Sequence, residues 1–94
     1  MTKQFVLVVY DISNDRRRTR LHNTLLNYGT PVQYSVFECL LDGEGLARMK
    51  KATTRVIKPS QDRVRYYYLC QECVARTEVT SGVEVLSEPP VIVV

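Results

Sequence analysis

The chain has 94 residues, of which 45% are hydrophobic and 24% charged, and its formal net charge is +3. This length fits one domain, residues 1–94, and the composition is that of a globular protein rather than a disordered one. No apolar run is long enough to cross a bilayer. The first four residues lead into a strand rather than a signal peptide, so we expect a cytoplasmic protein.

The charged residues are distributed unevenly along the chain. Four arginines cluster between residues 16 and 20, and a second basic region spans residues 48–65, whereas the chain after residue 70 is mostly acidic. This asymmetry indicates a surface that faces a polyanion. A solvated surface of mixed charge is the alternative.

The chain has three cysteines, and an odd number in a chain without a signal peptide argues against a disulfide framework. Cys70 and Cys73 form a single CxxC pair, which supplies half of a tetrahedral zinc site. A two-fold dimer could supply the other half. We favour the simpler interpretation of two small, partly buried thiols.

The first part of the chain predicts a strand followed by a helix. Residues 5–10 are apolar on both faces of a strand, which is typical of a central position in a sheet. Residues 13–15 are three successive N-cap types, so a helix begins there. Gly29 supplies its stop signal, and Pro31 prevents its continuation. The buried face of this helix is expected at Leu21, Leu25 and Tyr28.

The second part predicts a strand, a second helix and further strands. Residues 32–41 are rich in β-formers, and Asp42 can cap the following helix, which Pro59 ends. Residues 64–70 alternate as in a strand. The inner stripe of the second helix is expected at Leu46, Met49, Thr53 and Val56. Shorter strands are expected at residues 77–80, 83–86 and 91–94.

These elements predict a two-layer α/β sandwich, with one sheet and two helices on one of its faces. Phe37 and Tyr67 make the other face too apolar to be wet, so we expect a second copy to pack there. The tail, residues 87–94, ends in an apolar strand behind two prolines. Such a strand would aggregate as a free edge, and we expect it to join the sheet of the partner subunit.

The arginine cluster occupies an energetically unfavourable position at the start of a helix. Basic residues in the first turn of a helix are disfavoured by about 0.3–1 kcal/mol each, yet Arg16, Arg17 and Arg18 lie there. A bound phosphate would account for them, since free helix N–H groups and guanidinium groups both suit it. The alternative is that the side chains extend into water, with Asp15 softening the local field.

Asp11 follows Tyr10 at the end of the first strand, where ligand sites gather in sheets with crossover helices. A carboxylate beside arginines would bind a hard cation and a phosphate together, and Mg²⁺ takes one or two carboxylates. The alternative is a salt bridge to an arginine or a turn cap. A two-fold axis near the strand end would bring two copies of Asp11 together.

Other candidate residues carry weaker signals. His22 is the only histidine, and we expect it to be a surface or half-buried helix residue rather than a general base. Residues 66–68 are three tyrosines that could stack on bases. A strand divides them between its two faces, so core packing is the favoured use for most of them.

Several of these segments together resemble the second universal CRISPR-associated adaptation protein, the small partner of the CRISPR integrase. The resemblance rests on Val9–Ile12, Asp15–Arg18 with Arg20, Gly29, and Gln33–Glu38, and it extends over nearly the whole chain. It implies an α+β, ferredoxin-like fold and a homodimer. It also implies a tight turn near Tyr34 and Ser35, with residues 37–41 as the return strand.

The resemblance further implies roles for single residues. Asp11 matches the family's Mg²⁺-binding aspartate, paired across the dimer axis, and Tyr10 stands beside it in the catalytic cleft. Val32 stands where members often have a basic residue, which removes one phosphate contact. The remaining residues matched to the cleft are Arg18, Arg20, Ser35 and Phe37.

The implied function is that of a Mg²⁺-dependent endonuclease acting on RNA or DNA and a partner of the integrase in acquiring new spacers for antiviral defence. One alternative is a non-catalytic, dimeric scaffold that holds duplex DNA through Arg16, Arg17 and Arg20. Another is a toxin-like endoribonuclease on the same fold.

Overall fold

The computed structural model describes residues 2–80. In chain order the elements are β1 (Gln4–Asp11), α1 (Asp15–Leu25), β2 (Gly29–Gln33), β3 (Val36–Leu41), α2 (Gly43–Val56), β4 (Arg63–Leu69) and α3 (Gln71–Ala75). None of the described helices has the length and apolar character needed to span a membrane. The strands predicted at 83–86 and 91–94, and the tail 87–94, lie outside the described residues, so those predictions and the single domain over 1–94 stay predictions.

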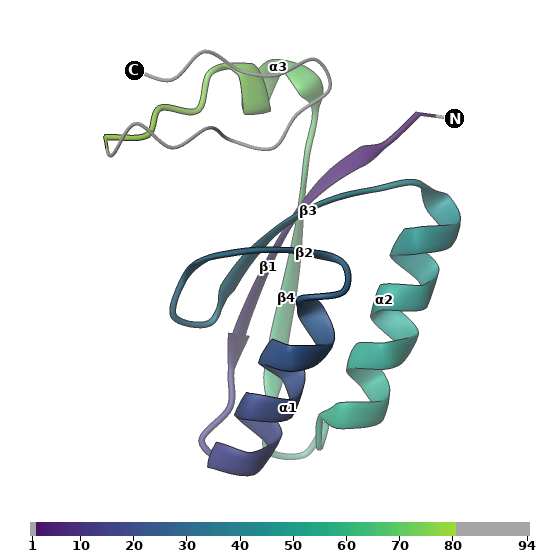
Figure 1. Cartoon of the computed structure of the whole chain (residues 1–94), viewed down its shortest axis with the longest axis vertical. Coiled ribbons are helices and arrows are strands. Elements are labelled where there is room, and N and C mark those ends of the chain that lie inside the picture. The colour runs from purple at the N-terminus through teal and green to yellow at the C-terminus, as the bar shows by residue number, and fades with distance from the viewer. Residues whose placement is uncertain (1, 81–94) are drawn as a thin grey trace.

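The four strands form one antiparallel sheet in the order β2-β3-β1-β4. Both long helices lie on the same face of it, side by side (Figure 1). This is the ferredoxin-like arrangement, so the predicted α+β two-layer sandwich is confirmed. β1 occupies the centre with partners on both edges, as its two apolar faces indicated.

Residues 32–41 do not form one strand. The chain turns at Tyr34 and Ser35, and Ser35 has a φ of 63°, in the left-handed region. Hairpin turns need such a conformation, which glycine and asparagine usually provide. A Tyr-Ser pair gives no sequence signal for it. The turn expected from the family resemblance is confirmed, and the single strand read from composition is wrong.

The main core lies between the sheet and the two long helices. Leu21 and Leu25 of α1 and Met49 of α2 are fully buried there, as predicted. Phe37 is also fully buried in this core, although we expected it on the opposite face. The turn at Tyr34 and Ser35 sets the register of β3, and that register points Phe37 toward α1. Neighbouring Cys39 is buried as well, which raises its thiol pKa to about 11.

Side-chain caps fix the start of each long helix. Asn14 Oδ1 accepts a hydrogen bond from the Arg17 amide at 2.9 Å. Asp42 Oδ1 accepts one from the Gly45 amide at 2.7 Å. Both caps fall within the positions predicted for them, and each satisfies an N–H group that the helix leaves free.

A smaller cluster closes one end of the opposite sheet face, where Phe5 is buried against Val74 of α3.

The strand predicted at residues 77–80 is wrong. The Thr77 amide donates to the Val74 carbonyl at 3.0 Å and its hydroxyl to the Cys73 carbonyl at 3.1 Å, so this residue closes α3. Cys73 is exposed, as is its CxxC partner Cys70, so neither is the partly buried thiol we expected.

Gly29 has a different role from the predicted helix stop. Helix α1 already ends at Leu25, and Gly29 begins β2. A methyl group at Gly29 would clash with the backbone carbonyl of Glu38 and lie 2.5 Å from Sγ of Cys39. The close approach of β2 to β3 therefore requires glycine at this position.

We expect Gly29→Ala to lower the free energy of unfolding by about 1–3 kcal/mol, because the added methyl group overpacks against strand backbone that cannot move aside. Gly43→Ala is the matched control, since a methyl group there meets no atom within 4 Å. Urea denaturation followed by circular dichroism measures both. Equal midpoints for the two variants would contradict this role of Gly29.

Candidate functional site

The site is built around the end of β1. Successive side chains of a strand point to opposite faces of its sheet. Tyr10 therefore points toward the helices and is buried, whereas Asp11 points to the other face and is exposed. In the register of the sheet, Asp11 lies opposite Arg63 of β4.

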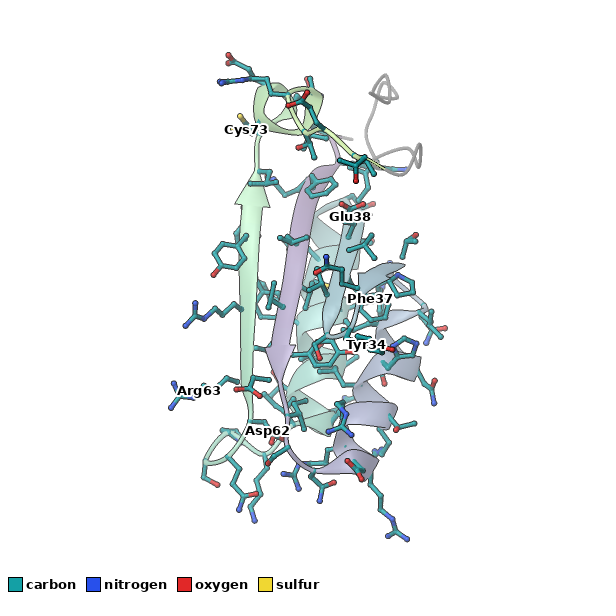
Figure 2. The ribbon with its side chains drawn as sticks, turned by 90° about the vertical axis from the view of Figure 1, so that its left-hand side faces the viewer. Tyr34, Phe37, Glu38, Asp62, Arg63 and Cys73 are labelled. Atoms are coloured by element: carbon teal, nitrogen blue, oxygen red, sulfur yellow. The ribbon has the colours of Figure 1, made fainter. Side chains whose placement is uncertain are left out.

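Asp11 lines a pocket of about 400 Å³ on the face that the long helices leave free. Arg63 and Arg65 of β4 line the same pocket, and Figure 2 shows Arg63 extending away from the helices. Tyr67 accepts a hydrogen bond from Arg65 Nη1 at 3.2 Å, which raises the pKa of that guanidinium. Among residues 2–80, Asp11 has no ion pair, so its carboxylate is available to a ligand.

The two arginines of this pocket were not among the predicted site residues. The signal for them was present, because residues 63–69 alternate, and Arg63, Arg65 and Tyr67 fall on one face. Finding them required the antiparallel register that brings Arg63 next to Asp11. That register depends on tertiary pairing.

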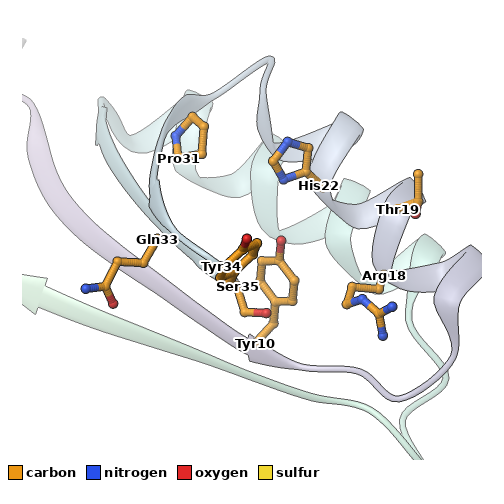
Figure 3. A pocket seen from close by; sticks show the side chains of 8 residues that line it. All are labelled: Tyr10, Arg18, Thr19, His22, Pro31, Gln33, Tyr34 and Ser35. Atoms are coloured by element: carbon orange, nitrogen blue, oxygen red, sulfur yellow. The ribbon is translucent and has the colours of Figure 1, made fainter.

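A second pocket, of about 700 Å³, lies between α1 and the β2–β3 turn (Figure 3). We call it the turn pocket. Its lining consists of Tyr10, Arg18, Thr19, His22, Pro31, Gln33, Tyr34 and Ser35. Tyr10 lines both pockets. Burial raises the pKa of its phenol, and the nearby charge of Arg18 opposes this only in part, so Tyr10 stays a neutral hydrogen-bond donor.

The structure thus separates the residues that were predicted to share one cleft. Arg18 and Ser35 lie in the turn pocket, whereas Asp11 lies in the other pocket. Phe37 lines neither, because it is fully buried. Its ring packs against Tyr10, with ring centroids 6.4 Å apart, and edge-on against His22 at 5.2 Å. His22 is half-buried, as predicted.

The four clustered arginines have different environments. Arg16 and Arg20 are exposed. Arg18 donates to the Ile12 carbonyl at 2.9 Å and pairs with Asp15, so its guanidinium is held by the protein and does not simply extend into water.

Arg17 is bound within the protein. Its Nε lies 2.7 Å from Asp62 Oδ2, and its Nη2 lies 3.1 Å from Asp62 Oδ1. Asp62 is buried and also accepts a hydrogen bond from the Lys58 amide at 2.7 Å. The hydrogen bonds from Arg17 lower the pKa of Asp62, against the opposing effect of its burial. Asp62 therefore accounts for the unfavourable helix position of Arg17 without a phosphate.

The three successive tyrosines divide between the faces of the sheet, as predicted. Tyr66 packs against the main core, whereas Tyr67 and Tyr68 are 44% and 46% exposed. Lys50 Nζ lies 5.5 Å from the Tyr66 ring centroid and 5.0 Å from that of Tyr68. Only Tyr66 packs in the core, so the prediction of core packing for most of the three tyrosines is wrong. No cluster of three or more potential metal ligands occurs among the described residues, and Cys70 and Cys73 have no further zinc ligand there.

A family model described as CRISPR associated protein Cas2 matches residues 4–77. The CRISPR-associated endoribonuclease Cas2 3 of Chloroflexus aurantiacus is 40% identical over 77 residues, which cover 82% of this chain and 83% of that protein. The crystal structure of Streptococcus pyogenes Cas2 at pH 6.5 has a TM-score of 0.72 and 30% identity, and the match covers 80% of this chain and 96% of that one. A chain in a partial Cas6-RT-Cas1–Cas2 complex has a TM-score of 0.72 and 25% identity, with 85% and 88% covered.

The buried pair of Arg17 and Asp62 predicts a pH-dependent contribution to stability. The folded-state pKa of Asp62 is lowered, so its contribution is complete above the unfolded-state value of about 3.9 and is lost as pH falls through the folded-state value. We therefore expect Asp62→Asn to lower the urea midpoint at pH 7 and to converge with the parent at pH values well below about 3.9.

Asp15→Asn is the control for this experiment, because its side chain is 87% exposed and surface ion pairs contribute little. At pH 7 its midpoint should differ from that of the parent by much less than the midpoint of Asp62→Asn does. A constant difference between the parent and Asp62→Asn across the acid range would contradict the assignment.

Proposed function

Because the chain belongs to the Cas2 family of CRISPR-associated proteins, we propose that it is an endonuclease that cleaves RNA or DNA and uses Asp11 as its catalytic residue. We further propose that it assists the CRISPR integrase in acquiring spacers for antiviral defence. The observation that carries this proposal is the exposed carboxylate of Asp11 beside Arg63 and Arg65, without an ion pair among the described residues. The endoribonuclease name of the Chloroflexus relative supports the reaction. A cytoplasmic location is part of the proposal.

Asp11 would hold the Mg²⁺ ion. This ion usually takes one or two carboxylates and completes its shell with water and substrate oxygens, so the exposed Asp11 carboxylate fits it as one ligand. When bound, the ion supplies a Lewis acid that activates water and offsets charge at the phosphate. Arg63 and Arg65 line the same pocket and are placed to neutralise the phosphate that is attacked. Tyr10 lines this pocket too, but its phenol points to the helix side of the sheet, so in this proposal it supports the end of β1 rather than donating to the phosphate at Asp11.

A second copy would complete the site. Val9 and Tyr67 lie on the sheet face that the long helices leave free, and Tyr67 is 44% exposed. A homodimer that covers this face around a two-fold axis near the end of β1 would bring two Asp11 carboxylates together. One aspartate is a weak metal site by itself, and a symmetric pair is a stronger one.

Nucleic acid would be held by cations outside this pocket. Arg16 and Arg20 are exposed near the start of α1. Helix α2 adds a basic surface at Arg48, Lys51 and Arg55, all exposed. Such residues contact backbone phosphates and set the position of the strand without reading its sequence.

A second candidate function is that of a DNA-holding scaffold for the integrase. The similarity to a chain in a Cas1–Cas2 complex favours it, and it is compatible with hydrolysis. The two functions differ in their need for Asp11. Spacer acquisition that survives the loss of this carboxylate would assign the biological role to the scaffold.

We expect Asp11→Asn to reduce Mg²⁺-dependent cleavage by at least about 100-fold, the scale on which a group that stabilises developing charge acts. Folding should be unchanged, because the side chain is exposed and has no ion pair among residues 2–80. The assay follows labelled single-stranded RNA and DNA with Mg²⁺ or with EDTA. Glu44→Gln, an exposed carboxylate on α2, is the control. Full cleavage by Asp11→Asn would refute the hydrolytic site.

We expect the double variant Arg16→Ala with Arg20→Ala to bind duplex DNA more weakly than the parent. The slope of the logarithm of the binding constant against the logarithm of the salt concentration should become less steep by about 0.9 for each phosphate that the variant no longer neutralises. Fluorescence anisotropy at several salt concentrations measures the slope. Arg76→Ala is the control, because this exposed arginine follows α3, at the far end of the sheet from α1. A slope equal to that of the parent would show that the two arginines do not bind the backbone.

A further inference from the structure

We propose that the turn pocket binds one unpaired nucleobase of the nucleic-acid strand that lies over Asp11. The inference rests on the proposed function in one respect, because it takes that strand as the ligand. Tyr10 lines both the turn pocket and the Asp11 pocket, so the two sites are adjacent. The pockets lie on opposite sides of the end of β1, so a strand that passes around this end with its backbone near Asp11 would present a base to the turn pocket.

The walls of the turn pocket suit a flat aromatic ligand. The rings of Tyr10, His22 and Tyr34 and the apolar ring of Pro31 line it (Figure 3). Proteins that bind single strands stack bases on such side chains, and stacking is tolerant of sequence because every base has a π-face. With a volume of about 700 Å³, the pocket is not filled by its own side chains.

The polar groups of the pocket suit the edge of a base. Tyr10 and Ser35 line it with hydroxyl groups, and neither side chain has a hydrogen bond to another described residue, whereas the side chain of Gln33 extends away from them (Figure 3). A hydroxyl both donates and accepts, and the edges of bases present both donors and acceptors.

The charge of the pocket favours a neutral base over a phosphate. Arg18 is the one arginine or lysine among the eight lining residues, and Asp15 and the Ile12 carbonyl already hold its guanidinium. A phosphate would have to compete with Asp15 for it. The cations that we expect to hold phosphates, Arg63 and Arg65, lie in the neighbouring pocket.

The turn is held so that Tyr34 can cover the pocket. Ser35 has a φ of 63°, and its carbonyl accepts a hydrogen bond from the Tyr10 amide at 3.0 Å. Conformations of this kind in non-glycine residues are costly and gather at functional sites. The Tyr34 side chain itself is 100% exposed, so its ring has no packing partner among the described residues and can stack on a base.

The test compares two single strands of equal length, one with all its bases and one built from abasic sites, bound by the full chain in EDTA. We expect the parent to bind the base-bearing strand more tightly, and Tyr34→Ala to lose on the order of tenfold of that affinity without weakening the abasic strand. Tyr68→Ala is the matched control, an exposed tyrosine outside the turn pocket that should change neither affinity.

Four results would overturn the proposal. Tyr34→Ala could bind the base-bearing strand like the parent, it could weaken both strands equally, or the parent could bind neither strand or both with equal affinity. EDTA prevents cleavage, so a failure of the Asp11 hydrolytic site would leave this measurement unaffected. Conversely, loss of base binding would leave the Asp11→Asn result intact.

Discussion

The double pairing of β1 is the constraint on which the site depends. β1 is hydrogen-bonded to β3 along one edge and to β4 along the other. The pairing with β4 extends to the end of β1, where Asp11 lies opposite Arg63. A shift of one residue in either register would exchange the faces of every side chain in the strand and expose the core. The directions of Tyr10 and Asp11 are therefore fixed to opposite faces. Two pockets of different chemistry form on either side of one strand end, and Tyr10 lines both of them.

The clustered arginines differ in role, because one of them stabilises the fold and others are exposed to bind a ligand. Arg17 ties the first turn of α1 to Asp62, in the segment between α2 and β4, and its residual exposure is small. This bond offsets the repulsion between a cation and the positive end of a helix. With Arg17 serving the fold, Arg16 and Arg20 remain exposed for a nucleic-acid backbone. Neighbouring arginines in one run thus have separate tasks, which the run itself does not reveal.

The parts of the fold that local patterns determine were predictable. The central position of β1, the buried face of α1 at Leu21 and Leu25, and the cap at Asp42 follow from apolar periodicity and cap chemistry, which act over a few residues. The turn at Tyr34 and Ser35 was not visible in composition, because it uses a strained serine in place of glycine. The family resemblance supplied it.

The features that were missed depend on pairings distant in sequence. Arg17 and Asp62 are separated by 45 positions, and no local rule links them. Arg63 becomes part of the site only through its register with Asp11. Phe37 lies on the opposite sheet face from the predicted one, because the turn at Tyr34 and Ser35 sets the direction of its side chain. In each case the sequence specified the residue type, and tertiary pairing specified its neighbour.

The symmetric pairing of two Asp11 carboxylates on one ion is tested most directly by counting bound metal. Mn²⁺ can stand in for Mg²⁺, and its binding can be titrated by electron paramagnetic resonance against chain concentration. We expect about one tightly bound ion for every two chains, as a single site on a two-fold axis requires, and its loss in Asp11→Asn. One ion for each chain, or tight binding that survives the substitution, would contradict a shared site.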